Sequence, residues 1–367
     1  MNKFNSILAI ACLAITFTAC KKDSVEPIIV PPPSDGSTLT LNGLIGAEAG
    51  SSAGNSVYVD FSKEKTTAVD RSSWDLGFYT GADFRVVLNN SASAGAKVLA
   101  ATSLAAVTEA DAVGLTLAVS QATPDPSDFT YFDDLSGSIA KTVIPAVSSV
   151  ATENKVIILN RGTGGGIAAR PWIKLKVTRN ATGGYTLQYA ELKETTNFKT
   201  VEIAKDANFS FNFVSLTTGA SVNVEPAKAD WDMVWGYSVY QTSFGGALVP
   251  YNFSDLVFIN SLAGVQAAEV LTADFTYAAF TEANLTSTKV VFSNARDAIG
   301  SKWRNTLAVA ATATTPAEPA GVRTNRFYLI KDATGNVYKL KFVSFISADG
   351  GTRGKPVIEY KLVKKGS

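Results

Sequence analysis

The sequence predicts a mainly β protein made of antiparallel sheets with few short helices. Three observations predict it: alternating apolar and polar segments, glycine-containing turns between neighbouring segments, and an internal repeat. The alternation is clearest at 173–177, 185–189 and 338–342, where apolar side chains fall on one face and polar ones on the other. The steps at 181–184 (ATGG) and 333–336 (ATGN) supply residues that tolerate positive φ, as tight hairpins need. Each half of the chain is therefore expected to end in an antiparallel hairpin.

The remaining elements follow from similar patterns. Strands are expected at 57–61 and 209–213, where aromatic and β-branched residues alternate with polar ones. Helix signals are few, and they fall at 95–107 and 278–286. The tract rich in Ala and Thr at 307–321 is expected to be a loop.

The strongest organisational feature is an internal repeat. The segment WDLGFY at 74–79 reappears as WDMVWGY at 231–237. Downstream, FRVVLNNS at 84–91 is echoed by LVFINS at 256–261, and the closing hairpins then repeat in the same order. Similar segments in one order at nearly one offset indicate a duplicated unit.

The N-terminus has the features of a lipoprotein signal peptide. Lys3 precedes a short apolar run at 7–15, and small residues lead into Cys20. We expect residues 1–19 to be removed and Cys20 to be acylated, because the apolar run is too short to span a bilayer. Residues 20–37 carry charges and three consecutive prolines, which predicts a disordered stalk. The protein is then held at the outer membrane by lipid alone, facing the cell exterior.

Beyond the stalk, length and composition predict two domains of ordinary globular character. The rest of the chain exceeds the usual size of one domain, and the repeat places the two domains at 38–199 and 200–367. The net charge of +1 gives no support to a basic face for nucleic acid. Cleavage removes Cys12, so the mature chain has no cysteine pair for a disulfide, and its stability rests on packed cores.

The absence of histidine excludes most enzyme mechanisms. Without it there is no Ser-His-Asp or Cys-His nucleophile, no histidine zinc site and no bis-histidine haem. A binding protein is therefore expected, with a glycoside hydrolase that uses only carboxylates as the enzymatic alternative. No loop has the dense Asp spacing of a calcium site, so no metal is expected, and the RGTGGG segment at 161–166 lacks the Gly-Lys-Ser/Thr ending of a phosphate loop. Asp75 and Asp232 are expected to point outward and to accept backbone hydrogen bonds, which is a role in the fold.

Taken in order, these motifs resemble the HmuY-like surface lipoproteins of Bacteroidetes. The similar segments are the Trp-Asp strand at 74–79 with Asn89, and the closing strands at 327–330, 339–342 and 358–360. The chain looks like two copies where the usual member looks like one. The CKKD start also resembles signals that send such lipoproteins to the cell surface. The resemblance implies a β-rich, lipid-anchored protein that captures haem and passes it to a TonB-dependent outer-membrane receptor.

The chain departs from the family at the haem ligands, which the resemblance implies are His or Met. Tyr79 stands where a His is expected, and the second copy has Tyr237 one residue further along. Tyrosinate can ligate haem iron, although a tyrosine at a strand exit is also typical of a packed or rim residue. Met233 can offer a thioether, but with Trp231 and Trp235 it also forms one face of a strand, which indicates a core stripe.

The sequence therefore predicts a surface binding protein that holds haem or another planar or hydrophobic ligand in a cleft between aromatic-lined strands. The candidate contact residues are Tyr79, Tyr237, Tyr240, Phe244, Tyr251 and Met233. Arginines can pair with the propionates of a porphyrin, but nothing in their spacing singles one out. The alternatives are an interaction protein, such as an adhesin or an accessory subunit of an uptake complex, and a glycan-binding module.

Overall fold

The structure is a computed structural model that describes residues 31–314 and 316–366. The predicted signal peptide and Cys20 lie outside the described residues. Pro33–Ser367 forms one compact unit. The described residues are mainly β, with 36% in strands and 11% in helices, which confirms the predicted fold class. Within them, no helix is long and apolar enough to cross a membrane.

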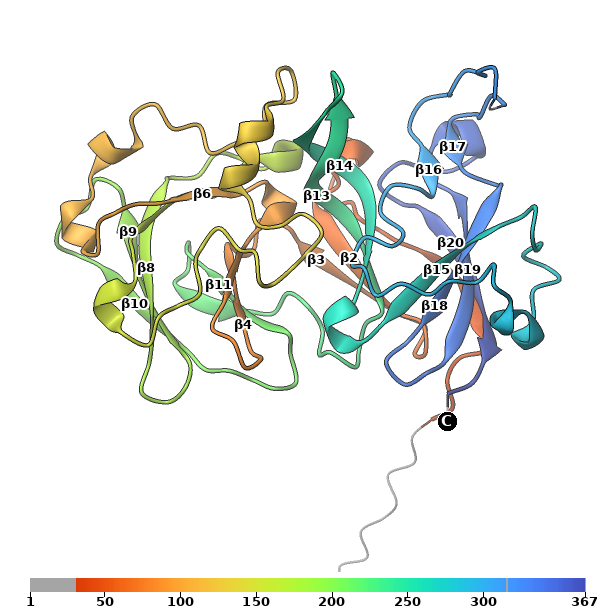
Figure 1. Cartoon of the computed structure of the whole chain (residues 1–367), viewed down its shortest axis with the longest axis horizontal. Helices are drawn as coiled ribbons and strands as arrows, with labels where there is room; N and C mark the ends of the chain where they lie inside the picture. Colours follow the sequence, from red (N-terminus) through yellow and green to blue (C-terminus); the bar gives the residue numbers. More distant parts are fainter. Residues whose placement is uncertain (1–30, 315, 367) are drawn as a thin grey trace, which may run out of the picture. The chain divides into compact units, whose positions relative to one another are not determined.

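Four antiparallel sheets carry the fold (Figure 1). Sheet A has the strand order β1 (Gly36–Thr40), β20 (Val357–Lys364), β19 (Val337–Ser344), β18 (Arg326–Lys331) and β15 (Gln266–Leu271). Sheet B has the order β14 (Ala247–Ile259), β13 (Met233–Phe244), β2 (Asn55–Asp60) and β3 (Lys65–Asp70). Sheet C has the order β12 (Ala220–Val222), β11 (Phe211–Ser215), β4 (Leu76–Tyr79) and β5 (Val86–Leu88). Sheet D has the order β10 (Lys199–Ile203), β9 (Tyr185–Glu191), β8 (Ile173–Arg179), β7 (Ile157–Asn160) and β6 (Gly95–Val98).

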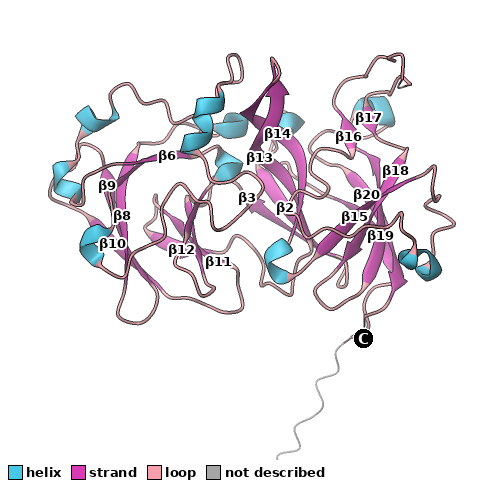
Figure 2. Cartoon of the chain, in the orientation of Figure 1, coloured by secondary structure: helices cyan, strands magenta, loops and turns pink. Residues whose placement is uncertain are grey.

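The smaller elements lie between these strands. β16 (Arg304–Asn305) and β17 (Gly321–Val322) form a two-stranded ribbon. Figure 2 shows that the helices are short pieces at the margins of the sheets. All are 3₁₀ turns: η1 (Gly50–Ser52), η2 (Asn90–Ala92), η3 (Leu104–Ala106), η4 (Glu109–Ala112), η5 (Pro126–Tyr131), η6 (Ala151–Glu153), η7 (Gly164–Gly166), η8 (Ser261–Ala263), η9 (Glu282–Thr286) and η10 (Ser347–Asp349).

Strand pairing connects the two halves of the chain in both directions. β2 pairs with β13 in the register Val59↔Met233, and β11 pairs with β4 in the register Phe213↔Gly77. The strand that precedes each Trp-Asp motif thus pairs with the strand that follows the other motif. β1 likewise pairs with β20. The predicted division into two domains near residue 200 remains a prediction, namely that each half folds independently.

Two large hydrophobic cores underlie the sheets. The first core packs sheet C on sheet D and draws its buried residues from Leu76 to Leu216. The second core packs sheet A on sheet B and combines residues 41–61 with residues 233–360. In β8, Ile173, Leu175 and Val177 are all buried, as the alternation predicts.

The two predicted hairpin turns are confirmed. The turn between β8 and β9 contains Gly183 with a φ of 84°, and the turn between β18 and β19 contains Gly335 with a φ of 90°. A positive φ is easily adopted only by glycine and a few polar residues, so these positions explain the turn signal in the sequence.

The helix expected at 95–107 is wrong. Its first residues form β6, which pairs with β7, and only Leu104–Ala106 makes a short 3₁₀ turn. The Ala-rich composition favours a helix locally, but Ala96 is fully buried between strands, so tertiary packing overrides propensity. Of the helix expected at 278–286, only the short η9 forms. β1 begins at Gly36, inside the predicted stalk.

Candidate ligand-binding site

The two Trp-Asp motifs make the same contacts to the strands that they receive from the other half of the chain. In each motif the Asp backbone N–H donates to that strand, and the Asp carboxylate accepts from an N–H two residues further along. The contacts are Asp75 N to Val214 O (2.9 Å), Leu216 N to Asp75 Oδ2 (2.7 Å), Asp232 N to Val59 O (2.7 Å) and Phe61 N to Asp232 Oδ2 (2.8 Å). Both side chains are buried, with 1% and 7% exposure, so the expected outward orientation is wrong while the backbone hydrogen bonds are confirmed.

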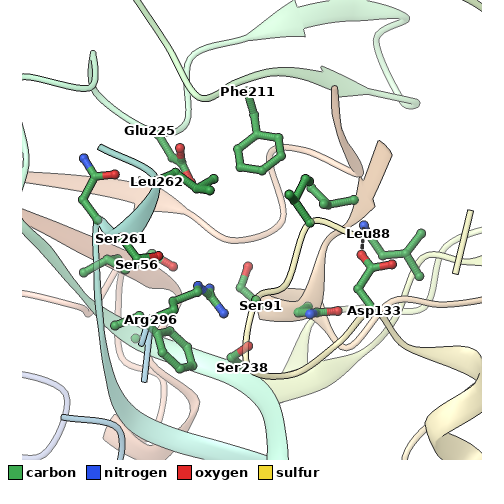
Figure 3. Close-up of a pocket in the computed structure, with 18 of the residues that line it drawn as sticks. Ser56, Leu88, Ser91, Asp133, Phe211, Glu225, Ser238, Ser261, Leu262 and Arg296 are labelled. Atoms are coloured by element: carbon green, nitrogen blue, oxygen red, sulfur yellow. Dashed lines mark hydrogen bonds between the residues drawn. The ribbon is translucent and has the colours of Figure 1, made fainter. Parts of the chain in front are cut away.

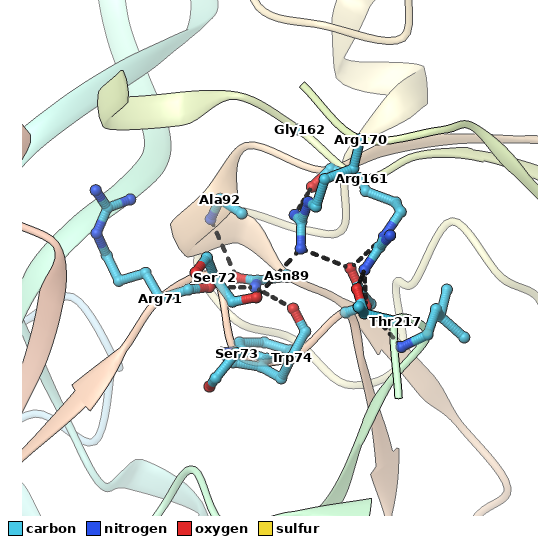
Figure 4. Close-up of polar contacts among 12 residues, drawn as sticks. Arg71, Ser72, Ser73, Trp74, Asn89, Ala92, Arg161, Gly162, Arg170 and Thr217 are labelled. Atoms are coloured by element: carbon cyan, nitrogen blue, oxygen red, sulfur yellow. Dashed lines mark hydrogen bonds and ion pairs between the residues drawn. The ribbon is translucent and has the colours of Figure 1, made fainter. Parts of the chain in front are cut away.

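An asparagine then ties each motif to the short 3₁₀ turn that follows. Asn89 Nδ2 donates to the carbonyls of Trp74 and Arg71, both at 2.8 Å (Figure 4). Asn260 Nδ2 donates to Trp231 O at 3.0 Å and to Lys228 O at 3.1 Å. The position of each tryptophan is therefore set by buried hydrogen bonds of the same kind.

The two aspartates differ in their charged partners. Asp75 forms a bidentate ion pair with Arg161, with both N···O distances at 2.8 Å, and Arg170 approaches it at 3.1 Å (Figure 4). Arg161 is the first residue of the glycine-rich 161–166 segment, so this segment has a structural role through its ion pair with Asp75. Among the described residues, no arginine or lysine forms an ion pair with Asp232, and burial raises its pKa to about 8. Asp232 therefore retains a proton at neutral pH.

A cavity of about 150 Å³ lies between the two motifs. Its walls come from β2, β5, η2, β11, β13, β14, η8 and the loop at 133–142 (Figure 3). Most of the large side chains that line it are aromatic: Tyr58, Trp74, Phe211, Phe213, Trp231, Tyr237 and Phe258. Both halves of the chain thus contribute equivalent elements to one site.

Arg296 and Glu225 are the polar groups that distinguish this cavity. The Arg296 guanidinium carbon lies 3.9 Å from the centre of the Phe258 ring. Glu225 is half-buried as a residue, but its Oε2 atom is buried and has no hydrogen-bond partner within the described chain. Burial raises the Glu225 pKa to about 7, against the opposing effect of Arg296. Trp231 Nε1 and Asn90 Oδ1 are likewise buried without partners in the described part of the chain.

Only Tyr237 among the predicted contact residues lines the cavity. Tyr79 lies half-buried on β4, with its ring centre 5.7 Å from that of Phe211. Met233 is fully buried in the second core, as the core-stripe interpretation predicts. These two candidates are therefore placed by packing contacts outside the cavity.

The other three candidates follow the β13–β14 hairpin away from the cavity. Tyr240 donates a hydrogen bond to Asp297 and packs against Phe253. Tyr251 also packs against Phe253, at 5.7 Å between ring centres. Phe244 lies near the tip of the hairpin with 52% exposure. Tyr240 and Tyr251, which lie opposite each other on the hairpin, thus gather at Phe253, whereas Phe244 lies apart near the tip.

Sequence reasoning counted Arg296 among seven arginines able to pair with propionates without singling it out, and it missed Glu225. Neither lies in a recognisable motif, and each reaches the cavity through tertiary contacts. The sequence signals of the cavity were the duplicated tryptophans and Tyr237, because Trp74, Trp231 and Tyr237 all line it.

Comparison with known proteins identifies the family. The family described as HmuY protein matches residues 52–360, which is most of the chain. The chain belongs to the HmuY family. HmuY proteins are surface-associated binding proteins linked with haem, and the family is not an enzymatic one. No curated protein and no solved structure matches the chain.

Because the HmuY family is linked with haem, we first ask whether the residues at the cavity can ligate haem iron. The chain has no histidine, and Met233, its only methionine besides Met1, is buried in the core. Tyr58 and Tyr237 line the cavity, where Tyr58 packs edge-on against Trp231 and the Arg71 guanidinium lies over the Tyr237 ring, and burial raises the pKa of both phenols. Ligation by tyrosine needs the phenolate. The described residues that line the cavity thus include no His or Met for haem iron, and their two phenols are held by packing contacts.

We predict that the protein is more stable at pH 5 than at pH 8. Burial raises the pKa of Asp232 to about 8, of Glu225 to about 7 and of Asp133 to about 6. The unfolded chain releases these protons near pH 4 while the folded chain keeps them, so stability falls as pH rises from 4 through the folded pKa values. The free energy of unfolding should drop by about 2 kcal/mol or more between pH 5 and 8, as measured by urea denaturation. Asp232→Asn should reduce this slope, and a stability that rises across the range would contradict the assignment.

Proposed function

We propose that this protein is a lipid-anchored surface protein that captures a small ligand in the cavity between its Trp-Asp motifs, without ligation of haem iron. The observation that carries the proposal is an aromatic-lined cavity in which the side chains of Arg296 and Glu225 have no hydrogen-bond or ion-pair partner within the described residues. Ligand pockets combine apolar walls with a few polar groups in this way. The cavity volume of about 150 Å³ favours a small ligand or one moiety of a larger one.

Capture needs no reacting group, only burial and orientation. Aromatic side chains bury large apolar area, and their rings stack on flat ligands. The polar groups of the cavity then select the orientation, because a ligand that leaves them unpaired in a low dielectric loses affinity. We therefore propose reversible binding without catalysis.

A haem titration tests the proposal that the protein does not ligate haem iron. Residues 33–367 should show no Soret or charge-transfer signature of tyrosine or methionine ligation, and Tyr237→Phe should behave as the wild type. Met233→Ala and Tyr79→Phe serve as further comparisons. A saturable ligation signature that one of these variants abolishes would show that iron is ligated, and the proposal would then be wrong.

Cavity-filling variants test the location of the site. Leu262 lines the cavity and is 43% exposed, so Leu262→Phe should be tolerated while it reduces the free space. Val291→Phe is the matched control, because Val291 is 71% exposed and does not line the cavity. In calorimetric titrations with small aromatic ligands, binding should be lost in Leu262→Phe and kept in Val291→Phe. Equal binding in both would place capture elsewhere.

The membrane part of the proposal depends on Cys20 and on family membership. We propose acylation at Cys20, display on the outer surface and transfer of the ligand to a TonB-dependent receptor. Cys20→Ala should abolish labelling with radioactive palmitate and release the protein from the outer-membrane fraction. To test the partner, the wild-type protein is purified from cells that display it, and a TonB-dependent outer-membrane receptor should co-purify with it.

A further inference from the structure

Arg296 is held in one position by three contacts, two with β14 and one with the 133–142 loop. Its backbone carbonyl accepts a hydrogen bond from Ile259 N at 2.9 Å, which fixes it beside β14. Its guanidinium lies over the Phe258 ring. A Cβ atom at Gly137 would come within 2.4 Å of Arg296 Cδ, so glycine allows the 133–142 loop to press against the arginine stem. The side chain is therefore preorganised, and Figure 3 shows it extending into the cavity.

The charge of Arg296 lacks the partners that the buried arginines Arg71 and Arg161 have. Arg71 donates to backbone carbonyls such as Ala53 O, and Arg161 pairs with Asp75. In the described chain, no hydrogen bond or ion pair reaches the Arg296 guanidinium, and Glu225 is not within ion-pair distance. Arg296 is half-buried and lines the cavity, so its unpaired N–H groups are available to an anion bound there.

We propose that the cavity binds a small planar ligand that carries a carboxylate, and that Arg296 pairs with this carboxylate while the aromatic walls bury the ligand's apolar body. This inference rests on the proposed capture function. The planar guanidinium fork matches a carboxylate through two parallel hydrogen bonds. Trp231 Nε1, buried without a partner in the described residues, offers a further donor on the same cavity.

A singly charged carboxylate suits the cavity better than a phosphate. One guanidinium neutralises one negative charge, and a dianion would leave its second charge unpaired among aromatic rings. The carboxylates of Asp133, Asp134 and Glu225 also line the cavity, and they would repel that second charge.

The test uses three ligands of nearly equal shape: benzoate, benzamide and benzylamine. With residues 33–367 at pH 6, benzoate should bind at least about tenfold more tightly than benzamide, and benzylamine should bind most weakly. Binding is measured by calorimetry and by fluorescence of Trp74 and Trp231, which line the cavity. The ligand series needs no variant, so it remains decisive if a substitution harms folding.

Arg296→Gln should remove the preference for benzoate over benzamide. Arg179→Gln is the matched control, because the Arg179 guanidinium also lies over a phenylalanine, 4.1 Å from the Phe84 ring centre, but outside the cavity. Arg179→Gln should bind benzoate with unchanged affinity. Thermal melting of both variants verifies that they are folded.

Glu225 should make the binding pH-dependent. Benzoate stays ionised from pH 6 to 8, because carboxyl pKa values lie near about 4. The other titratable groups that face the cavity are Asp133, Asp134, Tyr58 and Tyr237, and Arg296 stays charged. As pH rises through the Glu225 pKa, the ionised carboxylate repels the bound anion, so benzoate affinity should fall severalfold between pH 6 and 8. Glu225→Gln should restore it at pH 8 and change little at pH 6.

The outcomes separate this inference from the capture function. Equal affinity for benzoate and benzamide in the wild type, or an unchanged preference in Arg296→Gln, overturns the carboxylate inference and leaves capture standing. Failure of all three ligands to bind overturns the inference. If Leu262→Phe also leaves the affinity for every other small aromatic ligand unchanged, capture in this cavity is overturned as well.

Discussion

Asp75→Asn should destabilise the fold by about 3–5 kcal/mol, because it leaves Arg161 and Arg170 buried without their carboxylate. Breaking a buried ion pair from one side costs more than the pair contributes, since the remaining charges stay out of water. The loss appears as a lower midpoint in urea denaturation at pH 7 with an unchanged m-value.

Asp232→Asn is the internal control for this prediction. Asp232 makes the equivalent hydrogen bond to Phe61 N, but its raised pKa keeps it neutral at pH 7. Asn has nearly the shape of a protonated Asp, so we expect a cost of about 1 kcal/mol or less. Equal losses in the two variants would show that the ion pairs at Asp75 contribute nothing beyond the shared backbone contacts.

A fragment of residues 38–199 should fail to fold cooperatively, whereas residues 71–228 should fold. The first fragment separates β2 from β13 and deprives β4 of β11, its hydrogen-bonded neighbour. The second fragment keeps the whole first core, from Leu76 to Leu216, together with sheets C and D. Circular dichroism and urea denaturation of the two fragments measure this difference directly.

The two fragments differ little in length, so size alone does not explain the expected result. Cooperative unfolding of 38–199 together with a disordered 71–228 would show that each sequence repeat folds on its own. The boundary predicted from the repeat would then hold, and the strand exchange would be a feature of the complete chain only.

Local patterns were sufficient for the strands and turns. The alternation at Ile173, Leu175 and Val177 and the glycines at 183 and 335 depend on neighbouring residues alone. The helix expected at 95–107 failed because its residues have a local preference that the pairing of β6 with β7 overrides.

Long-range partners were not predictable from one sequence. The strands at β2 and β11 have similar patterns, so nothing in either says which Trp-Asp strand it joins. Asp75 and Asp232 look alike in sequence, and only the distant Arg161 makes them different. Arg296 is positioned at the cavity by contacts with Phe258 and with the loop at Gly137, which lie on separate parts of the chain.

The exchange of strands also determines when each sheet can finish folding while the chain is being synthesised. β1 and β2 emerge first, yet β2 needs β13 and β1 needs β20, the last strand made. β1 therefore stays unpaired until almost the whole chain is available, and β2 has only β3 beside it until β13 is made. Contacts so distant in sequence form slowly. A chain that stops growing early exposes unpaired strand edges near its N-terminus, and such edges favour aggregation of the incomplete chain.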